Sequence, residues 1–218
     1  MRKWFACLLI LLAAASLATL AFAQMRGGAR RDGSASEALR AKREASARGD
    51  ERLRRLLSAA GVGLDESSLA PAGGAFRGLK ISWQTPGQKG SSASPLRAEH
   101  LSQSVASAVV SERRGAGGVP RERSLELSPE HVFVATVDAK SRLRWWSVMP
   151  DPRVLRSEGP KAEGDDELTG LRLFRPEAEF FVNLPDDAEA AELRFYHPLA
   201  EGGEFRLQLL GAVSLRRD

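Results

Sequence analysis

The sequence predicts a mainly β protein, in which an antiparallel β-sandwich over residues 123–218 follows a partly helical, partly disordered region. Two observations support this fold class. Short runs of alternating apolar and polar residues recur after residue 123 with turn signals between them, which is typical of a sandwich. In addition, eight of the ten Phe and Trp residues after residue 23 lie beyond residue 130, so most large apolar side chains belong to the C-terminal part.

Residues 1–23 have the organisation of a signal peptide. A positive start at residues 1–3 precedes an apolar run over residues 4–20, and small residues surround a cleavage site between Ala23 and Gln24. We therefore expect a periplasmic or secreted protein. The alternative is anchoring by an uncleaved segment, because the apolar run is nearly long enough to span a bilayer. The preference for Arg over Lys suggests a bacterial source.

Composition limits the chemistry of the mature chain. Cys7 is the only cysteine and lies in the leader, so disulfides, thiol catalysis and thiolate metal sites are excluded after cleavage. Residues 24–130 carry 18 basic and 12 acidic side chains, whereas residues 131–218 carry 12 basic and 16 acidic. This asymmetry predicts a basic arm that contacts an anionic partner or folds back onto its own acidic domain.

Residues 24–122 are expected to hold two or three helices joined by flexible linkers. The polar, glycine-rich residues 24–33 are expected to be disordered, and a capping box at Ser34 and Glu37 predicts a helix to Arg48. A second helix is indicated from Asp50 by apolar residues at helical spacing. These are Leu53, Leu56, Leu57 and Ala60, and we expect a Schellman ending at Gly61 in which Val62 contacts Leu57.

Four arginines lie away from the apolar stripe of this second helix: Arg48, Arg52, Arg54 and Arg55. A basic amphipathic helix can lie on an anionic membrane surface or bind a partner. We favour a solvated face on a helix that docks against its own domain, because four apolar positions make a weak membrane anchor.

The remaining part of this region is mixed. Residues 75–83 have strand character and are expected to join the later domain, and residues 85–94 read as a flexible linker. Ser94 and Pro95 predict the start of a helix to Arg113, although residues 105–110 would also suit a strand.

Within the sandwich, residues 131–137 are apolar on both faces and should form a central strand. A turn leads to a return strand over residues 142–149, whereas residues 157–170 read as a loop. Alternation from residue 193 predicts a final hairpin with a bulge at Gly211, and charge pairing favours a register with Tyr196 opposite Arg206. The pattern broadly resembles small exported bacterial immunoglobulin-like domains, although no motif identifies a particular family.

A search for catalytic signatures finds no nucleophile elbow, zincin motif or phosphate-binding loop. An enzyme remains an alternative if His131, His197 and Glu130 meet near the acidic loop over residues 163–167. The simpler interpretation is that both histidines are strand-end residues and that the acidic loop is solvated. We therefore expect no metal site and no cofactor.

One aromatic pair suggests a binding surface. Strand alternation directs Trp145 inward and Trp146 outward beside Arg144, and an outward Trp next to Arg can bind a sugar ring or a peptide. Tyr196 and Arg206 are expected on an outer face as well. For Trp146 we favour the interpretation that the N-terminal helices cover it, because those helices need a surface to pack against.

The sequence thus favours an exported, non-catalytic envelope or secreted protein whose sandwich is an interaction module with a basic N-terminal arm. Its expected partner is an envelope component or another protein, with peripheral contact to an anionic membrane surface as a further option. Nucleic acid is not expected, because the basic segment lacks aromatic residues for base stacking. The ligand and the oligomeric state are not indicated by any pattern.

Overall fold

The structure is a computed structural model. It describes residues 49–70, 74–87, 92–120, 125–160 and 168–216. The chain divides into two units between Asp50 and Glu51, and the helices and strands named in this subsection belong to the unit that begins at Glu51. The predicted leader, the segment 24–33, the helix up to Arg48 and the acidic loop lie outside the described residues. Across those ranges, no helix has the length and apolar character needed to cross a membrane.

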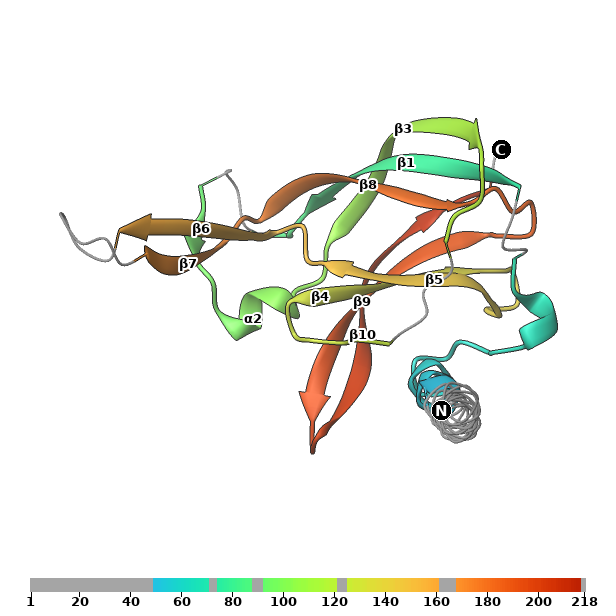
Figure 1. Cartoon of the computed structure of the whole chain (residues 1–218), viewed down its shortest axis with the longest axis horizontal. Coiled ribbons are helices and arrows are strands. Elements are labelled where there is room, and N and C mark those ends of the chain that lie inside the picture. The colour runs from blue at the N-terminus through green and yellow to red at the C-terminus, as the bar shows by residue number, and fades with distance from the viewer. Residues whose placement is uncertain (1–48, 71–73, 88–91, 121–124, 161–167, 217–218) are drawn as a thin grey trace, which may run out of the picture. The chain divides into compact units, whose positions relative to one another are not determined.

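The protein is mainly β, as predicted, and its strands form three antiparallel sheets with the orders β3-β1-β8, β10-β9-β4-β5 and β2-β7-β6 (Figure 1). The strands are β1 (Ala75–Gln84), β2 (Ser94–Pro95), β3 (Ala106–Ala116), β4 (His131–Val137), β5 (Leu143–Pro150), β6 (Val154–Pro160), β7 (Leu168–Phe174), β8 (Glu177–Pro185), β9 (Glu192–Glu201) and β10 (Glu204–Ser214). Residues 51–59 are helical, and two short helices follow, η1 (Glu66–Ser68) and α2 (Ala98–Leu101).

The first two sheets form a sandwich around one apolar core. Leu79, Ile81 and Trp83 of β1 are buried together with Val132 and Val134 of β4. Burial of each such side chain contributes roughly 1.5–3 kcal/mol. The predicted central position of residues 131–137 is confirmed, because β4 lies between β9 and β5.

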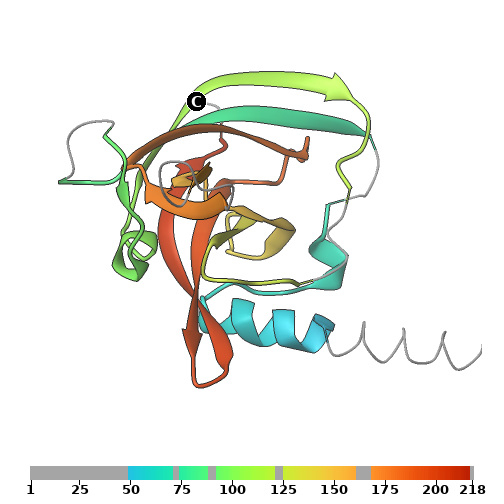
Figure 2. The ribbon, with the colours of Figure 1, turned by 60° about the vertical axis from the view of Figure 1, so that its left-hand side comes forward.

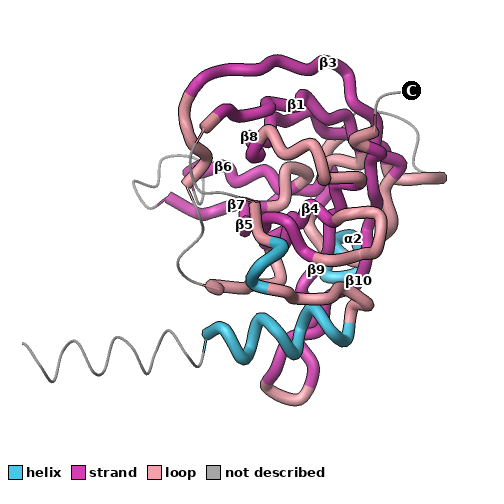
Figure 3. The backbone as a smooth tube through the Cα atoms, turned by 90° about the vertical axis from the view of Figure 1, so that its right-hand side faces the viewer, coloured by secondary structure: helices cyan, strands magenta, loops and turns pink. Residues whose placement is uncertain are grey.

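The helix over residues 51–59 covers the other face of the four-stranded sheet (Figure 2). Leu53, Leu56 and Leu57 are buried in a second apolar cluster that includes Phe133. The predicted Schellman ending is confirmed: Gly61 has φ 72° and the amide of Val62 donates to the carbonyl of Leu57 at 2.9 Å. The amphipathic pattern of this helix therefore reflects packing onto its own sheet. Figure 3 shows this layer from the side.

The immunoglobulin-like part of the prediction is not confirmed. In an immunoglobulin sheet the second strand lies between the first and the fifth. Here β1 lies between β3 and β8, so the first strand in the chain occupies the centre of its sheet. Residues 75–84, as predicted, form a strand of this sheet. The core therefore draws on both sides of the domain boundary expected at residue 123.

Two secondary-structure predictions are wrong. The helix expected from Ser94 to Arg113 is replaced by β2, the single-turn helix α2 and the strand β3. Residues 104–111 are rich in Ser and Val, which have low helix propensity, and pairing with β1 satisfies their backbone. Of the loop expected over residues 157–170, the described residues 157–160 belong to β6 and residues 168–170 to β7, and these two strands pair with each other. The sequence over residues 157–160 is polar and contains Gly and Pro, so it gives no strand signal.

The predicted register of the last hairpin is also wrong. Leu199 lies opposite Arg206, and Tyr196 lies opposite Leu209. A two-residue turn of Gly202 and Gly203, both with positive φ, sets this pairing. The expected bulge is present between Leu209 and Gly211. The pairs at Arg206 and Tyr196 both lie on the turn side of this bulge, so the two-residue turn determines them and charge pairing does not.

A buried ion pair connects the sheets. Arg153 and Asp151 are both fully buried, and the guanidinium of Arg153 donates to both carboxylate oxygens at 3.0 and 2.7 Å. The same guanidinium donates to the carbonyls of Leu101 and Gln103. Its central carbon Cζ lies 5.4 Å from the ring centre of Trp83 in β1 and 5.4 Å from that of Phe174 in β7. One side chain thus contacts elements of separate sheets.

Replacing Asp151 by Asn should leave the Arg153 charge buried without a counter-ion, and should lower the free energy of unfolding by about 3–5 kcal/mol. Urea denaturation followed by Trp fluorescence measures this change. The matched control is Arg97→Ala, since the Arg97 side chain is 71% exposed and its loss should cost within about 0.5 kcal/mol. A loss below about 1 kcal/mol for Asp151→Asn would contradict the assigned role.

Candidate functional site

The tip of the β9-β10 hairpin projects beyond its sheet (Figures 1 and 2). β4 pairs with β9 only as far as Tyr196, so the following part of the hairpin has no β4 partner. The turn at Gly202 and Gly203 allows the two strands to stay paired up to Glu201 and Glu204. This geometry brings charged side chains of the tip close to the helix over residues 51–59.

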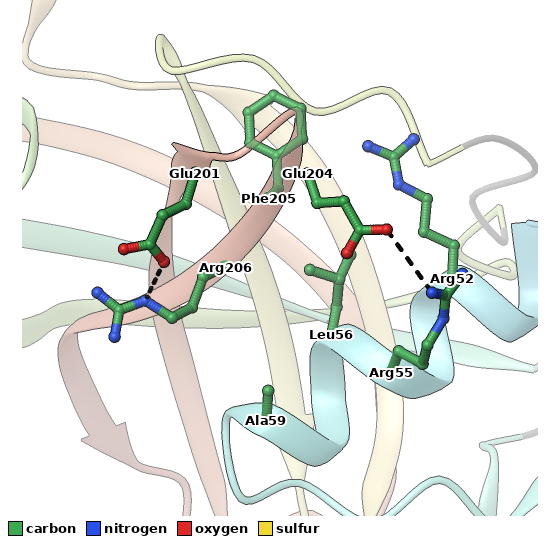
Figure 4. A pocket seen from close by; sticks show the side chains of 8 residues that line it. All are labelled: Arg52, Arg55, Leu56, Ala59, Glu201, Glu204, Phe205 and Arg206. Carbon is green, nitrogen blue, oxygen red and sulfur yellow. Dashed lines mark ion pairs between the residues drawn. The ribbon is translucent and has the colours of Figure 1, made fainter.

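A hollow of about 330 Å³ lies between this helix and the hairpin tip, and we refer to it as the helix-hairpin pocket (Figure 4). It is lined by Arg52, Arg55, Leu56, Ala59, Glu201, Glu204, Phe205 and Arg206. Leu56, Ala59 and Phe205 supply apolar surface, and the other side chains are charged. Five of the eight lining side chains are charged, so the lining is more polar than that of most small-ligand sites.

The charges of the pocket are only partly compensated. Arg55 pairs with Glu204 at 3.6 Å and Arg206 pairs with Glu201 at 3.3 Å. These side chains are all at least 60% exposed, so the pairs are weak and open to competition. The guanidinium of Arg52 lies 5.7 Å from the ring centre of Phe205, and among the described residues no carboxylate forms an ion pair with it. The pocket therefore carries one cation more than anions.

Three of the binding residues expected from the sequence meet in this pocket, namely Arg52, Arg55 and Arg206. Arg54 is directed elsewhere and pairs with Glu66 at 3.6 Å. Arg48 lies outside the described residues. The basic face of the helix is thus divided between a part that faces the hairpin and a part that does not.

The aromatic surface expected around Trp146 is not assembled. Trp146 is half-buried and stacks on Phe133, with ring centres 5.6 Å apart, in the cluster that the helix covers. Covering by an N-terminal helix was the favoured interpretation of this residue, and it is the one observed. Tyr196 lies on the outer face of its strand, as expected, since Leu193 and Phe195 face the sandwich core, but the helix-covered cluster on that outer face leaves it only 2% exposed.

Arg144 is also buried and does not accompany Trp146 at the surface. Its guanidinium donates to Asp187 at 2.7 Å and pairs with Glu189 at 2.8 Å. The hydrogen bond to Asp187 is the main reason why the pKa of Arg144 is raised. A bulge opposite Thr136 and Val137 places Arg144 outside the simple alternation of β5. Arg144 therefore anchors the loop after β8.

The two histidines of the enzyme alternative face opposite sides of one sheet. His131 is two residues before Phe133, which lies in the helix-covered cluster, so strand alternation places it on that side. His197 follows Tyr196 of that cluster and therefore faces the sandwich core, near Arg153. Among the described residues, no three His, Asp or Glu side chains come together as metal ligands.

Sequence reasoning missed the contributions of Glu201, Glu204 and Phe205. The signal was present in the short stretch over residues 201–206, where a double glycine is flanked by charges and an aromatic residue. A tight turn with such flanks predicts a hairpin tip with side chains held close together. Its proximity to the helix, however, depends on tertiary packing.

Comparison with known proteins found no match to a family model, to a curated protein or to a solved structure. The fold and the pocket together define a mainly β sandwich protein with a partly charged surface pocket.

The buried His197 should make stability depend on pH. Burial lowers its pKa, the Asp151 charge opposes this effect, and the Arg153 charge adds to it. Because the unfolded side chain has a pKa of about 6.5, the unfolded state binds more protons below that pH. The stabilisation from neutral His197 is thus fully present above about pH 6.5 and is lost as the pH falls toward the folded pKa.

Urea midpoints at pH 7.5, 6.5 and 5.5 should fall with pH for the unaltered protein, and the fall should be smaller in His197→Gln. His100→Gln serves as the control. Equal pH slopes for the unaltered protein and His197→Gln would show that another group controls the acid sensitivity.

Proposed function

We propose that this protein is an exported, non-catalytic binding module that holds an anionic group of an envelope component or partner protein in the helix-hairpin pocket. The observation that carries this proposal is the convergence of Arg52, Arg55 and Arg206 from two elements far apart in the sequence. Arginine is well suited to carboxylate and phosphate groups, because its planar fork donates two parallel hydrogen bonds.

The arrangement supports binding in a specific way. The Glu partners of Arg55 and Arg206 are exposed and can swing aside, while Arg52 already lacks a carboxylate partner among the described residues. An incoming anion would therefore gain charge-assisted hydrogen bonds without removing a buried pair. Leu56 and Phe205 offer apolar contact to the part of the ligand that bears the anion.

The opposed directions of His131 and His197 weigh against the enzyme alternative, because a shared site requires both on one face. The leader over residues 1–23 supports the export part of the proposal.

Charge reversal at Arg52 or Arg55 should weaken cosedimentation of the purified protein with isolated cell-envelope fractions by at least about ten-fold, as expected for loss of a charge-assisted hydrogen bond. Binding should also fall between about 0.1 and 1 M salt, because screening shortens from about 10 to 3 Å.

The matched control is Arg54→Glu, which alters the same helix outside the pocket. Retained binding by this control locates the contact in the pocket. An equal loss for all three variants would instead indicate an extended basic surface on a membrane, and salt-resistant binding would reject the anionic ligand.

The proposed export predicts a defined N-terminus. The protein recovered after secretion should begin at Gln24 by intact mass, because small side chains at the cleavage site fit signal peptidase. Ala23→Leu should block this processing, whereas Phe22→Leu, at the tolerant middle position, should not. Recovery of the unaltered protein at full length in the membrane fraction would favour the uncleaved anchor.

A further inference from the structure

A second hollow, of about 490 Å³, lies where the end of β1 meets the start of β8, and we refer to it as the β1-β8 hollow. The two strands are paired along its length (Figure 1). Its lining is mostly polar and contains Ser82, Gln84, Arg175, Glu177 and Glu179. The buried Trp83 lines it as well. The hollow therefore shares no residue with the helix-hairpin pocket.

The charges of the β1-β8 hollow are balanced. Glu179 pairs with Lys80 at 2.7 Å, and Glu177 accepts a hydrogen bond from the amide of Gln84 at 3.4 Å. Arg175 supplies a second cation, so two carboxylates face two cations. An anionic ligand would meet both carboxylates and a cationic ligand would meet Lys80 and Arg175, and like charges brought together are costly. Charge complementarity thus favours an uncharged ligand.

Buried polar atoms without a partner gather at this end of the sheet. Among the described residues, eight buried side-chain nitrogen or oxygen atoms lack a hydrogen-bond partner, and three of them belong to Trp83, Thr85 and Arg175. Trp83 and Arg175 both line the hollow, and Trp83 is only 1% exposed. Because buried polar groups in proteins are nearly always paired, the indole N–H of Trp83 and the Nε–H of Arg175 are donors that a ligand can satisfy.

An exposed aromatic ring continues this surface along β8. Strand alternation places Phe181 on the same face as Glu177 and Glu179, and Phe181 is 59% exposed. The guanidinium carbon of Arg113 lies across Gly78 and is 5.7 Å from the ring centre. Phe181 follows Glu179 by roughly 7 Å along the strand, so an occupant that contacts both the hollow and the ring is longer than one sugar ring.

We propose that the β1-β8 hollow and Phe181 together bind an uncharged glycan. A sugar hydroxyl both donates and accepts, so one ligand satisfies the donors of Trp83 and Arg175 and also donates to the carboxylate of Glu177. The apolar C–H face of the adjoining sugar packs on the ring of Phe181, as aromatic side chains with one open face allow. Hydroxyl-rich and apolar surfaces alternate in a glycan as they do along this face of β8.

Titration calorimetry of the purified protein with neutral hexasaccharides, cellohexaose and chitohexaose, tests this proposal. The charged comparisons are a glucuronate hexamer and the deacetylated, basic form of chitohexaose. At least one neutral hexamer should bind about five-fold or more tightly than either charged hexamer, and more tightly than its own disaccharide. Its affinity should change less than about two-fold between 0.1 and 1 M salt, because screening acts on charges.

Two variants locate the contact. Glu177→Ala should weaken binding of the neutral hexamer by about ten-fold or more, as expected for loss of a charge-assisted hydrogen bond. Phe181→Ala should weaken it by about two- to ten-fold through loss of ring packing. The matched controls are Glu99→Ala and Leu209→Ala, which remove a carboxylate that is 68% exposed and an apolar side chain that is 50% exposed outside the hollow. Both controls should retain binding.

A further measurement uses the unaltered protein. In NMR spectra the indole N–H resonance of Trp83 should shift when the neutral hexamer is added, whereas that of Trp145, which also lacks a partner, should not. The pocket variant Arg52→Glu should retain glycan binding, so failure of this proposal is distinguishable from failure of the proposed anion site. Preference for a charged hexamer, equal loss in the controls, a shift of Trp145 alone, or no saturable binding at about millimolar hexamer would each overturn the glycan assignment.

Discussion

The buried pair of Arg153 and Asp151 is the interaction on which the arrangement of the sheets most depends. A fully buried guanidinium is costly unless its charge and all its donors are satisfied. Here Asp151 supplies the charge and the carbonyls of Leu101 and Gln103 take further donors. Since these partners come from distant parts of the chain, the pair is complete only when the α2 segment and the β5-β6 connection have both docked.

The buried ion pair also packs against aromatic side chains from separate sheets of the sandwich. Arg153 lies between the rings of Trp83 and Phe174, while Trp83 also meets Phe180 and Phe195 edge to face at 4.8 and 4.9 Å. The ion pair is therefore continuous with the apolar core. Its geometry leaves His197 buried beside it, so acid sensitivity and sheet closure share one location.

The opposite face of the four-stranded sheet is covered by a helix and not by a second sheet. There the helix over residues 51–59 provides the apolar cover, and its polar side remains free to form the helix-hairpin pocket. The pocket therefore offers a ligand side-chain charge rather than main-chain hydrogen bonds.

Local patterns in the sequence determined much of the molecule. Apolar spacing set the helix and its glycine ending at Gly61, two apolar faces made β4 central, and Gly211 marked a bulge, because these features depend on neighbours within one or two turns of chain. Alternation placed Trp146 and Tyr196 on the outer face of the sandwich, but only the tertiary structure decided that the helix over residues 51–59 covers them. The position of Arg144 also depended on the tertiary structure, because a bulge interrupts the alternation of β5. The same holds for the partners of Arg153 and for the meeting of Arg52, Arg55 and Arg206. Contacts between segments about 150 residues apart leave no periodic trace in sequence.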